Sequence, residues 1–135
     1  MIRSGAYRPG TSLNVLVVDD DYFMQRVAII LLDSLGHSGV VVDDGKKALE
    51  CLAQRRFDLV LLDIMMPVMD GLEALATIRT KEQHMGSHLP IIMVTGHAEP
   101  TDQIRLKQAG ADGYVTKPID ITKLQTEIDR VMLQS

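Results

Sequence analysis

The sequence predicts an α/β fold in which five parallel strands alternate with five helices. Five short apolar runs, each of a length suited to a buried strand, are each followed by apolar residues at helical spacing. The links between these segments are short, and successive parallel strands need crossovers of the kind that the predicted helices provide. The central run, residues 59–62, shows no alternation of polar and apolar side chains, which is typical of a parallel strand covered on both faces.

The composition excludes several classes of protein. A formal net charge of −4 argues against a surface that binds nucleic acid. The single cysteine, Cys51, excludes an intramolecular disulfide and a CxxC metal site. The sequence has no apolar run long enough to span a bilayer and no signal-peptide pattern. We therefore expect a cytoplasmic domain that contacts neither nucleic acid nor membrane directly.

The first strand–helix pair is predicted from residue 13 onward. Residues 13–18 are rich in Leu and Val and end in three aspartates, residues 19–21. Apolar residues at helical spacing then continue to Leu35, where Gly36 is suited to end a helix. Asp21 is expected to cap this helix. Residues 1–12 show no periodicity, so we expect a flexible leader followed by a folded domain at 13–133.

The third strand, residues 59–62, is the centre of the prediction. It ends abruptly in a carboxylate, Asp63. Pro67 cannot donate to a sheet and excludes a longer strand, and Asp70-Gly71 forms the turn into the next helix. Ligands of open α/β sheets bind outside the carboxyl ends of the strands. Asp63 is therefore a candidate site residue on position alone.

Three further strand–helix segments complete the pattern. The remaining strands are predicted at residues 40–42, 91–94 and 114–116. The remaining helices are marked by apolar residues within 48–52, 72–78, 104–109 and 124–132. The polar stretch 81–89 is expected to be a loop after the third helix. His37, His84 and His88 are interpreted as solvated loop residues.

Polar side chains stand at the exits of four predicted strands. They are Asp19 and Asp20, Asp63, Thr95 and Lys117. In a parallel sheet these exits lie at one edge, so three carboxylates, a hydroxyl and an ammonium group are expected to converge. Clustered carboxylates need a cation or protons, and oxygen ligands without His or Cys favour Mg²⁺. Such a set suits phosphoryl transfer with Asp63 as the nucleophile.

Four segments in this order resemble the response-regulator receiver domains of two-component signalling. They are Val-Val-Asp-Asp (17–20), Leu-Asp-Ile-Met-Met-Pro-Val-Met-Asp-Gly (62–71), Met-Val-Thr-Gly (93–96) and Tyr-Val-Thr-Lys-Pro (114–118). The resemblance covers residues 13–133. It implies a flavodoxin-like, doubly wound (βα)5 sheet with strand order 2-1-3-4-5.

The resemblance also implies partners and ligands. A sensor histidine kinase or a histidine phosphotransfer domain would give its phosphoryl group to Asp63. Mg²⁺ would be held by the side chains of Asp19, Asp20 and Asp63 and by the backbone carbonyl of Met65. The domain would act as a switch, with no catalysis beyond its own phosphorylation from small phosphodonors and its own dephosphorylation.

Three residues would connect phosphorylation to the output surface. By the same resemblance, Lys117 would contact the phosphoryl group, Thr95 would bond to it, and Tyr114 would turn inward when Thr95 moves. The affected surface is formed by the fourth helix, fifth strand and fifth helix, with a homodimer through it as one arrangement. The downstream target is not indicated, and the domain could be a stand-alone regulator, a relay intermediate or a piece of a hybrid kinase.

Other interpretations of these residues remain open at this point. Asp19 and Asp20 could be helix caps, Thr95 could cap the following helix, and Tyr114 could be a packed aromatic. An aspartyl-phosphate phosphatase would need a second Asp at position 65, where this chain has Met. A degenerate receiver, used only for binding, would lack one of the acidic residues or the lysine, and none is missing.

Overall fold

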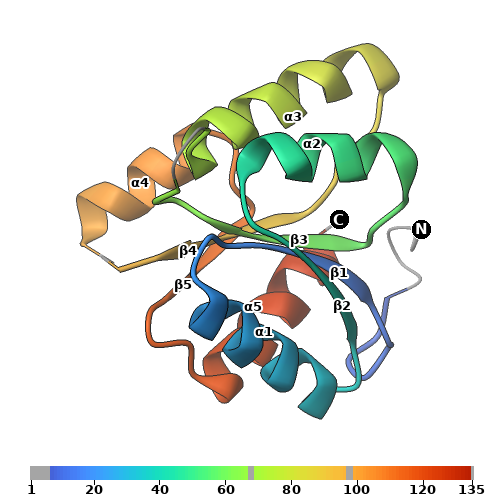
Figure 1. The fold of residues 1–135 in the computed structure, drawn as a ribbon, viewed down its shortest axis with the longest axis vertical. Coiled ribbons are helices and arrows are strands. Elements are labelled where there is room, and N and C mark those ends of the chain that lie inside the picture. Colours follow the sequence, from blue (N-terminus) through green and yellow to red (C-terminus); the bar gives the residue numbers. More distant parts are fainter. Residues whose placement is uncertain (1–6, 67–68, 97–98, 135) are drawn as a thin grey trace.

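The computed structural model describes residues 7–66, 69–96 and 99–134, in which five strands alternate with five helices (Figure 1). The strands are β1 (Asn14–Val18), β2 (Ser38–Val42), β3 (Leu59–Asp63), β4 (Ile91–Thr95) and β5 (Gly113–Thr116). The helices are α1 (Tyr22–Ser34), α2 (Gly45–Gln54), α3 (Gly71–Met85), α4 (Pro100–Gln108) and α5 (Ile121–Gln134). All strand pairs are parallel, in the order β2-β1-β3-β4-β5. The predicted fold class and strand order are confirmed. Pro67 lies outside the described residues.

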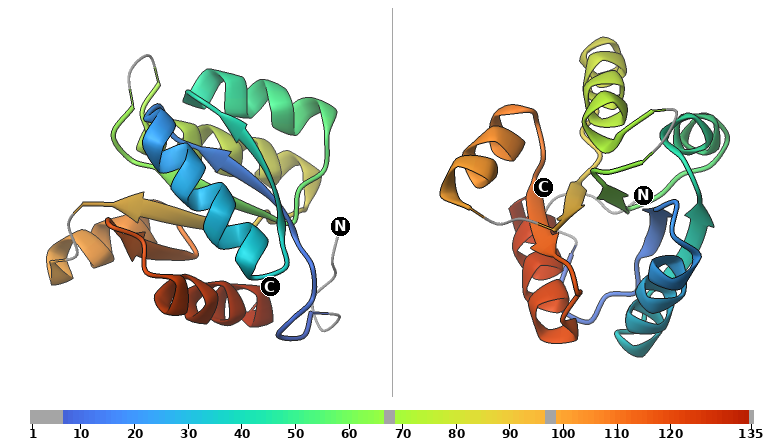
Figure 2. Two further views of the ribbon diagram at one scale, coloured as in Figure 1. Left: turned by 60° about the horizontal axis from the view of Figure 1, so that its bottom comes forward. Right: turned by 60° about the vertical axis from the view of Figure 1, so that its left-hand side comes forward.

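Helices cover both faces of the sheet (Figure 2). One apolar cluster lies between the sheet and α1 and α5, and a second lies between the sheet and α2, α3 and α4. Every residue of β3 is buried, which explains why this strand shows no polar–apolar alternation in the sequence. None of the described helices is long and apolar enough to cross a bilayer, and the cytoplasmic location stays a prediction.

Aspartate side chains cap the first turns of four of the described helices. Asp21, Asp44, Asp70 and Asp120 each accept a hydrogen bond, 2.7–2.9 Å long, from a backbone N–H two or three residues further on. These bonds satisfy amide groups that have no partner within the helix. The prediction that Asp21 caps the first helix is confirmed.

The prediction of a loop over residues 81–89 is wrong for its first half, because α3 continues to Met85. The helix ends at Gly86, whose φ of 67° lies in the left-handed region. Glu82 is buried within this last part of α3, where its carboxylate accepts hydrogen bonds from Arg79 (2.6 Å) and from the backbone N–H of Leu89 (2.5 Å). This part of α3 is polar in sequence because Glu82 is buried with its carboxylate hydrogen-bonded, while its helical neighbours face solvent.

The interpretation of His37 as a solvated residue is also wrong. Its side chain is 4% exposed, and its Nδ1 accepts a hydrogen bond of 3.1 Å from the backbone N–H of Leu13. Burial lowers the pKa of His37. His84 is exposed as predicted, but it lies in the last turn of α3 and not in a loop. His88 is exposed and lies 2.6 Å from a carboxylate oxygen of Asp112.

Tyr7 corrects the prediction of a flexible leader in residues 1–12. The Tyr7 ring is buried in the cluster under α1 and α5, and its hydroxyl donates to Asp129 of α5 over 2.5 Å. Residues 1–6 lie outside the described part of the chain. The folded part therefore includes Tyr7, which precedes the predicted start of the domain at residue 13.

Gly71, the first residue of α3, packs directly against the end of β3. A Cβ atom added at Gly71 would lie 2.2 Å from the backbone oxygen of Asp63 and 2.8 Å from the Cα of Ile64. Both contacts are with backbone, which cannot move aside without displacing the strand end. The absence of a side chain at Gly71 thus lets α3 start beside Asp63.

We predict that Gly71→Ala lowers the free energy of unfolding by about 2 kcal/mol or more, because overpacking against backbone forces the strand end to shift. The measurement is equilibrium unfolding in urea. Gly96→Ala is the matched control, since an added Cβ there meets no atom of the described residues within 4 Å. Equal stability of the two variants would contradict the close packing of α3 on β3.

Candidate functional site

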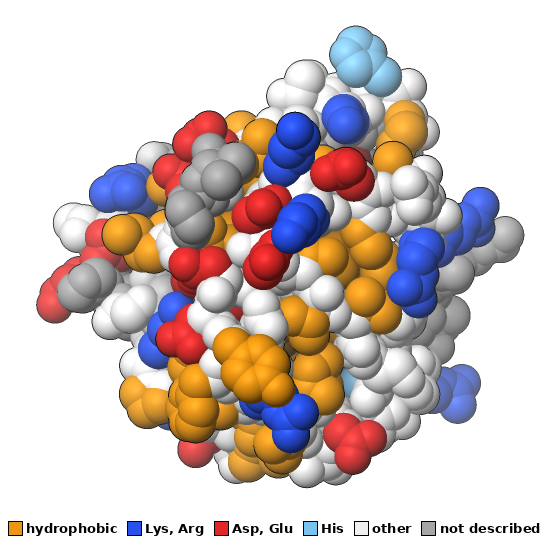
Figure 3. Space-filling model, in the orientation of Figure 1, with side chains coloured by type: hydrophobic (Ala, Val, Ile, Leu, Met, Phe, Trp, Pro, Cys, Tyr) orange, Lys and Arg blue, Asp and Glu red, His pale blue; other side chains and the backbone are white. Residues whose placement is uncertain are grey.

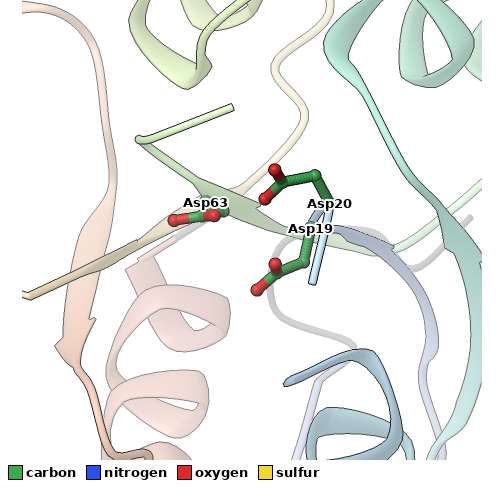
Figure 4. Close-up of side chains that lie close together, drawn as sticks. All are labelled: Asp19, Asp20 and Asp63. Atoms are coloured by element: carbon green, nitrogen blue, oxygen red, sulfur yellow. The ribbon is translucent and has the colours of Figure 1, made fainter. Parts of the chain in front are cut away.

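Three aspartates meet at the carboxyl edge of the sheet (Figure 4). Asp63 is the last residue of β3, and Asp19 and Asp20 follow directly after β1, its neighbour in the sheet. Val18 and Leu62 are register partners, so β1 and β3 end at the same level of the sheet. Each aspartate offers one carboxylate oxygen, and these oxygens lie within 4.8 Å of one another. The predicted convergence of these carboxylates is present.

Lys117 provides positive charge at this cluster. Its Nζ lies 3.1 Å from Oδ1 of Asp63 and 4.0 Å from Oδ2 of Asp19. Asp63 is 2% exposed and Asp19 is 5% exposed, whereas Asp20 is exposed to solvent. Among the described residues, this ammonium group pairs with the two buried carboxylates, and Asp20 adds a third, exposed carboxylate to the cluster.

The electrostatics of the buried pair follow from this imbalance. Burial raises the pKa of Asp63, and the hydrogen bond and charge of Lys117 oppose that shift. Burial also raises the pKa of Asp19, the N–H of Asp21 lowers it, and the charge of Asp63 raises it. Both carboxylates thus carry an electrostatic cost when ionised.

Hydrogen bonds connect the two acidic loops to the backbone around them. Asp19 accepts from the N–H of Asp21 (2.9 Å), and its backbone carbonyl accepts from Nε2 of Gln25 (2.6 Å). Asp63 accepts from the N–H of Met65 (3.4 Å), so the backbone of Met65 lies beside the carboxylate while its side chain is 78% exposed. No pattern in the sequence indicates this contact of Gln25, because the contact depends on the turn between β1 and α1.

Thr95 and Tyr114 occupy the same face of the sheet. Thr95 is the buried last residue of β4 and pairs in register with Thr116 of β5. Tyr114 lies two residues before Thr116 and packs, half-buried, against the cluster under α2, α3 and α4. Side chains two apart on a strand point to the same face. The N–H of Lys117 donates to the carbonyl of Thr95 (2.8 Å), which links the two strand ends.

The donor set of the cluster fits a hard divalent cation. It consists of carboxylate oxygens, with Asp20 open to solvent and available for hydrated ions. Mg²⁺ is bound in proteins by one or two carboxylates together with waters and phosphate oxygens. Three carboxylates opposed by one lysine leave an excess of negative charge that a divalent ion would balance.

The fold and this site define an acidic-pocket α/β domain with a buried aspartate beside a lysine. Residues 15–129 match the sequence profile of the response regulator receiver domain. The chain therefore belongs to the response-regulator receiver family of two-component signalling. Domains of this family act as signalling switches that interact with histidine kinases or phosphotransfer proteins, and they bind Mg²⁺ in an acidic pocket.

The similar proteins include separate receivers and parts of larger kinases. Chemotaxis protein CheY-3 of Vibrio cholerae is 36% identical over 121 residues, which are 89% of this chain and 92% of that protein. Hybrid signal transduction histidine kinase I of Dictyostelium discoideum is 40% identical over 111 residues, 78% of this chain. This chain spans 6% of that kinase.

A solved structure carries the same fold together with a metal ion. The receiver domain of a sensor histidine kinase from Pseudomonas aeruginosa, with a magnesium ion coordinated in its active site cleft, matches with a TM-score of 0.79 and 33% identity. The match covers 90% of this chain and 98% of that domain.

We predict that Asp19→Asn stabilises the metal-free protein at pH 7 by about 1 kcal/mol, because it removes a buried charge that the folded state tolerates poorly. In the folded state the pKa of Asp19 is raised above its ordinary value of 3.8. Between these two pKa values the native state therefore binds more protons than the unfolded state. Stability therefore falls as pH rises through the raised pKa, and the advantage of the variant should vanish below pH ~4.

The measurement is urea unfolding in EDTA across a pH series. Asp33→Asn, at an exposed position of α1, makes the same change of charge and serves as the control. A loss of stability in Asp19→Asn at pH 7, relative to this control, would show that the ionised carboxylate is favoured in the fold.

Proposed function

We propose that this domain accepts a phosphoryl group on Asp63 from a phosphohistidine of a sensor kinase or a histidine phosphotransfer domain. One observation carries the proposal: a buried carboxylate at the end of the central strand lies 3.1 Å from Lys117 and within 4.8 Å of two further carboxylate ligand atoms. The proposed nucleophile, a cation that would balance its charge and the proposed metal ligands thus lie at one sheet edge, which supports the proposal.

In the proposed reaction a carboxylate oxygen of Asp63 attacks phosphorus. The P–N bond to the donor histidine breaks, a P–O bond to Asp63 forms, and the histidine nitrogen keeps the electron pair of the broken bond. Asp19, Asp20, Asp63 and the carbonyl of Met65 would hold Mg²⁺, which would supply positive charge for the phosphoryl oxygens when bound. Lys117 would pair with a phosphoryl oxygen, since its ammonium group already lies beside Asp63.

The switch that we propose uses Thr95 and Tyr114. A phosphoryl group adds charge and acceptor oxygens at Asp63, and the Thr95 hydroxyl would donate to one of them. Thr95 and Tyr114 lie on the same face of the sheet, which supports a coupling in which Tyr114 moves inward as Thr95 moves. Phosphorylation would then shift an equilibrium between two forms of the α4–β5–α5 surface, by its difference in affinity for them. A homodimer through that surface stays a prediction.

We predict that incubation with acetyl phosphate and Mg²⁺ adds the mass of one phosphoryl group to the wild type, and that Asp63→Asn abolishes the adduct. The asparagine keeps the size of the side chain but lacks the nucleophilic carboxylate. The measurement is intact-mass spectrometry, with and without EDTA. Asp33→Asn is the control and should retain the adduct.

A promiscuous histidine kinase is the second donor, because small phosphodonors do not serve every receiver. Phosphoryl transfer from either donor that depends on Asp63 and on Mg²⁺ supports the proposal. Failure with both donors, or an adduct that survives in Asp63→Asn, would contradict it.

A further inference from the structure

A groove lies at the end of the sheet opposite to the carboxylates. It has a volume of about 550 Å³ and is lined by the C-terminal parts of α2 and α3 and by the segments that follow them. These helix ends lie at the right of Figure 1, whereas β3 and β4 run toward the left. The groove therefore shares no residue with the proposed phosphorylation site, and it has no part in the function proposed above.

The lining of the groove is largely apolar. Phe57 and Ile78 form a buried base, and Leu52 and Leu89 are partly covered. Met85, at the end of α3, is 70% exposed at its margin. Methionine adapts to different partner shapes because its side chain is unbranched and flexible. This surface can accept apolar side chains from another molecule.

Three exposed cations border this apolar surface. Arg55 and Arg56 follow α2, and Lys81 belongs to α3. The ion pairs found among the described residues involve none of the three. The guanidinium of Arg55 lies 5.3 Å from the centre of the Phe57 ring, a cation–π contact that places a cation beside the apolar base.

The acid in the groove lining does not offset these charges. Glu82 is buried, and its carboxylate is already bound by Arg79 (2.6 Å) and by the N–H of Leu89 (2.5 Å). The groove is thus cationic at its rim on a chain whose net charge is −4. In Figure 3, Lys and Arg side chains lie at the right edge of the molecule, beyond the end of α2, and acidic side chains gather toward the left.

We propose that this groove docks an acidic amphipathic helix of a partner protein. Its apolar side chains, spaced i, i+3, i+4 and i+7, would lie on the base formed by Phe57 and Ile78. Its Asp or Glu side chains would pair with Arg55, Arg56 and Lys81, and arginine can bind a carboxylate through two N–H groups. Nucleic acid suits the groove less, because the apolar floor of the groove cannot bind phosphates. Three cations would also release few counterions from a nucleic acid, so the electrostatic gain would be small.

The test uses two labelled synthetic peptides of about 15 residues, long enough for a few helical turns. Both carry Leu at the helical spacing; one has Glu and the other Lys at all flanking positions. Fluorescence anisotropy measures binding, and ¹H–¹⁵N spectra of the protein locate it. We expect saturable binding of the Glu peptide, with shifts in α2, α3 and residues 55–57, and binding of the Lys peptide weaker by about tenfold or more.

The variant Arg55→Glu/Arg56→Glu should weaken binding of the Glu peptide by about tenfold or more. The control, Arg105→Glu/Lys107→Glu, makes the same change of charge at exposed positions of α4. This control should bind the Glu peptide as tightly as the wild type does. Neither Asp63→Asn nor phosphorylation is expected to alter peptide binding, so this proposal can fail independently of the proposed function.

Four outcomes would overturn the groove proposal. They are absence of saturable binding, equal binding of both peptides, shifts confined to another surface, and tighter binding of a single-stranded oligonucleotide of similar length than of the Glu peptide.

Discussion

The repulsion among Asp19, Asp20 and Asp63 is the interaction on which the rest of this structure depends. Parallel pairing of β1 and β3 brings these residues to one sheet edge, where their ligand oxygens lie within 4.8 Å of one another. At such separations each pair of charges costs about 3–4 kcal/mol at an effective dielectric near 20. Lys117 offsets part of this cost. The remainder is an excess of negative charge that a bound cation would balance.

The surrounding fold keeps the carboxylates from moving apart. All five residues of β3 are buried between two apolar clusters, so Asp63 cannot swing into solvent without disturbing the core. Gly71 lets α3 begin against the carbonyl of Asp63, and Gln25 holds the carbonyl of Asp19. Proteins commonly give up stability to hold a functional site in an unfavourable arrangement. The acidic pocket fits this pattern.

The sequence was sufficient to predict the sheet and the residues at its edge, because both follow from local patterns. An apolar run that stops at Asp63 reports a buried strand and its exit, and the parallel arrangement then places Asp19, Thr95 and Lys117 nearby. His37 and Tyr7 could not be placed in this way. Each is buried by segments distant in sequence, and neither has a local pattern that reports such packing.

The stretch 81–89 shows the same limit on a smaller scale. Its polarity suggested a loop, but Glu82 is paired with Arg79 and with the N–H of Leu89, so α3 continues to Met85. Polar composition does not distinguish a solvated loop from a helix whose buried acid is paired. The groove between α2 and α3 depends on these contacts and could not have been inferred from the sequence.

The most direct test of the acidic pocket is the effect of Mg²⁺ on unfolding of the wild type and of Asp20→Asn in urea, at constant ionic strength. Mg²⁺ at ~10–100 times its dissociation constant should stabilise the wild type by about 1–3 kcal/mol, because it binds the native carboxylates and relieves their repulsion. Asp20→Asn should lose most of this gain. An equal gain in both proteins, or none in the wild type, would contradict a cation-dependent carboxylate site.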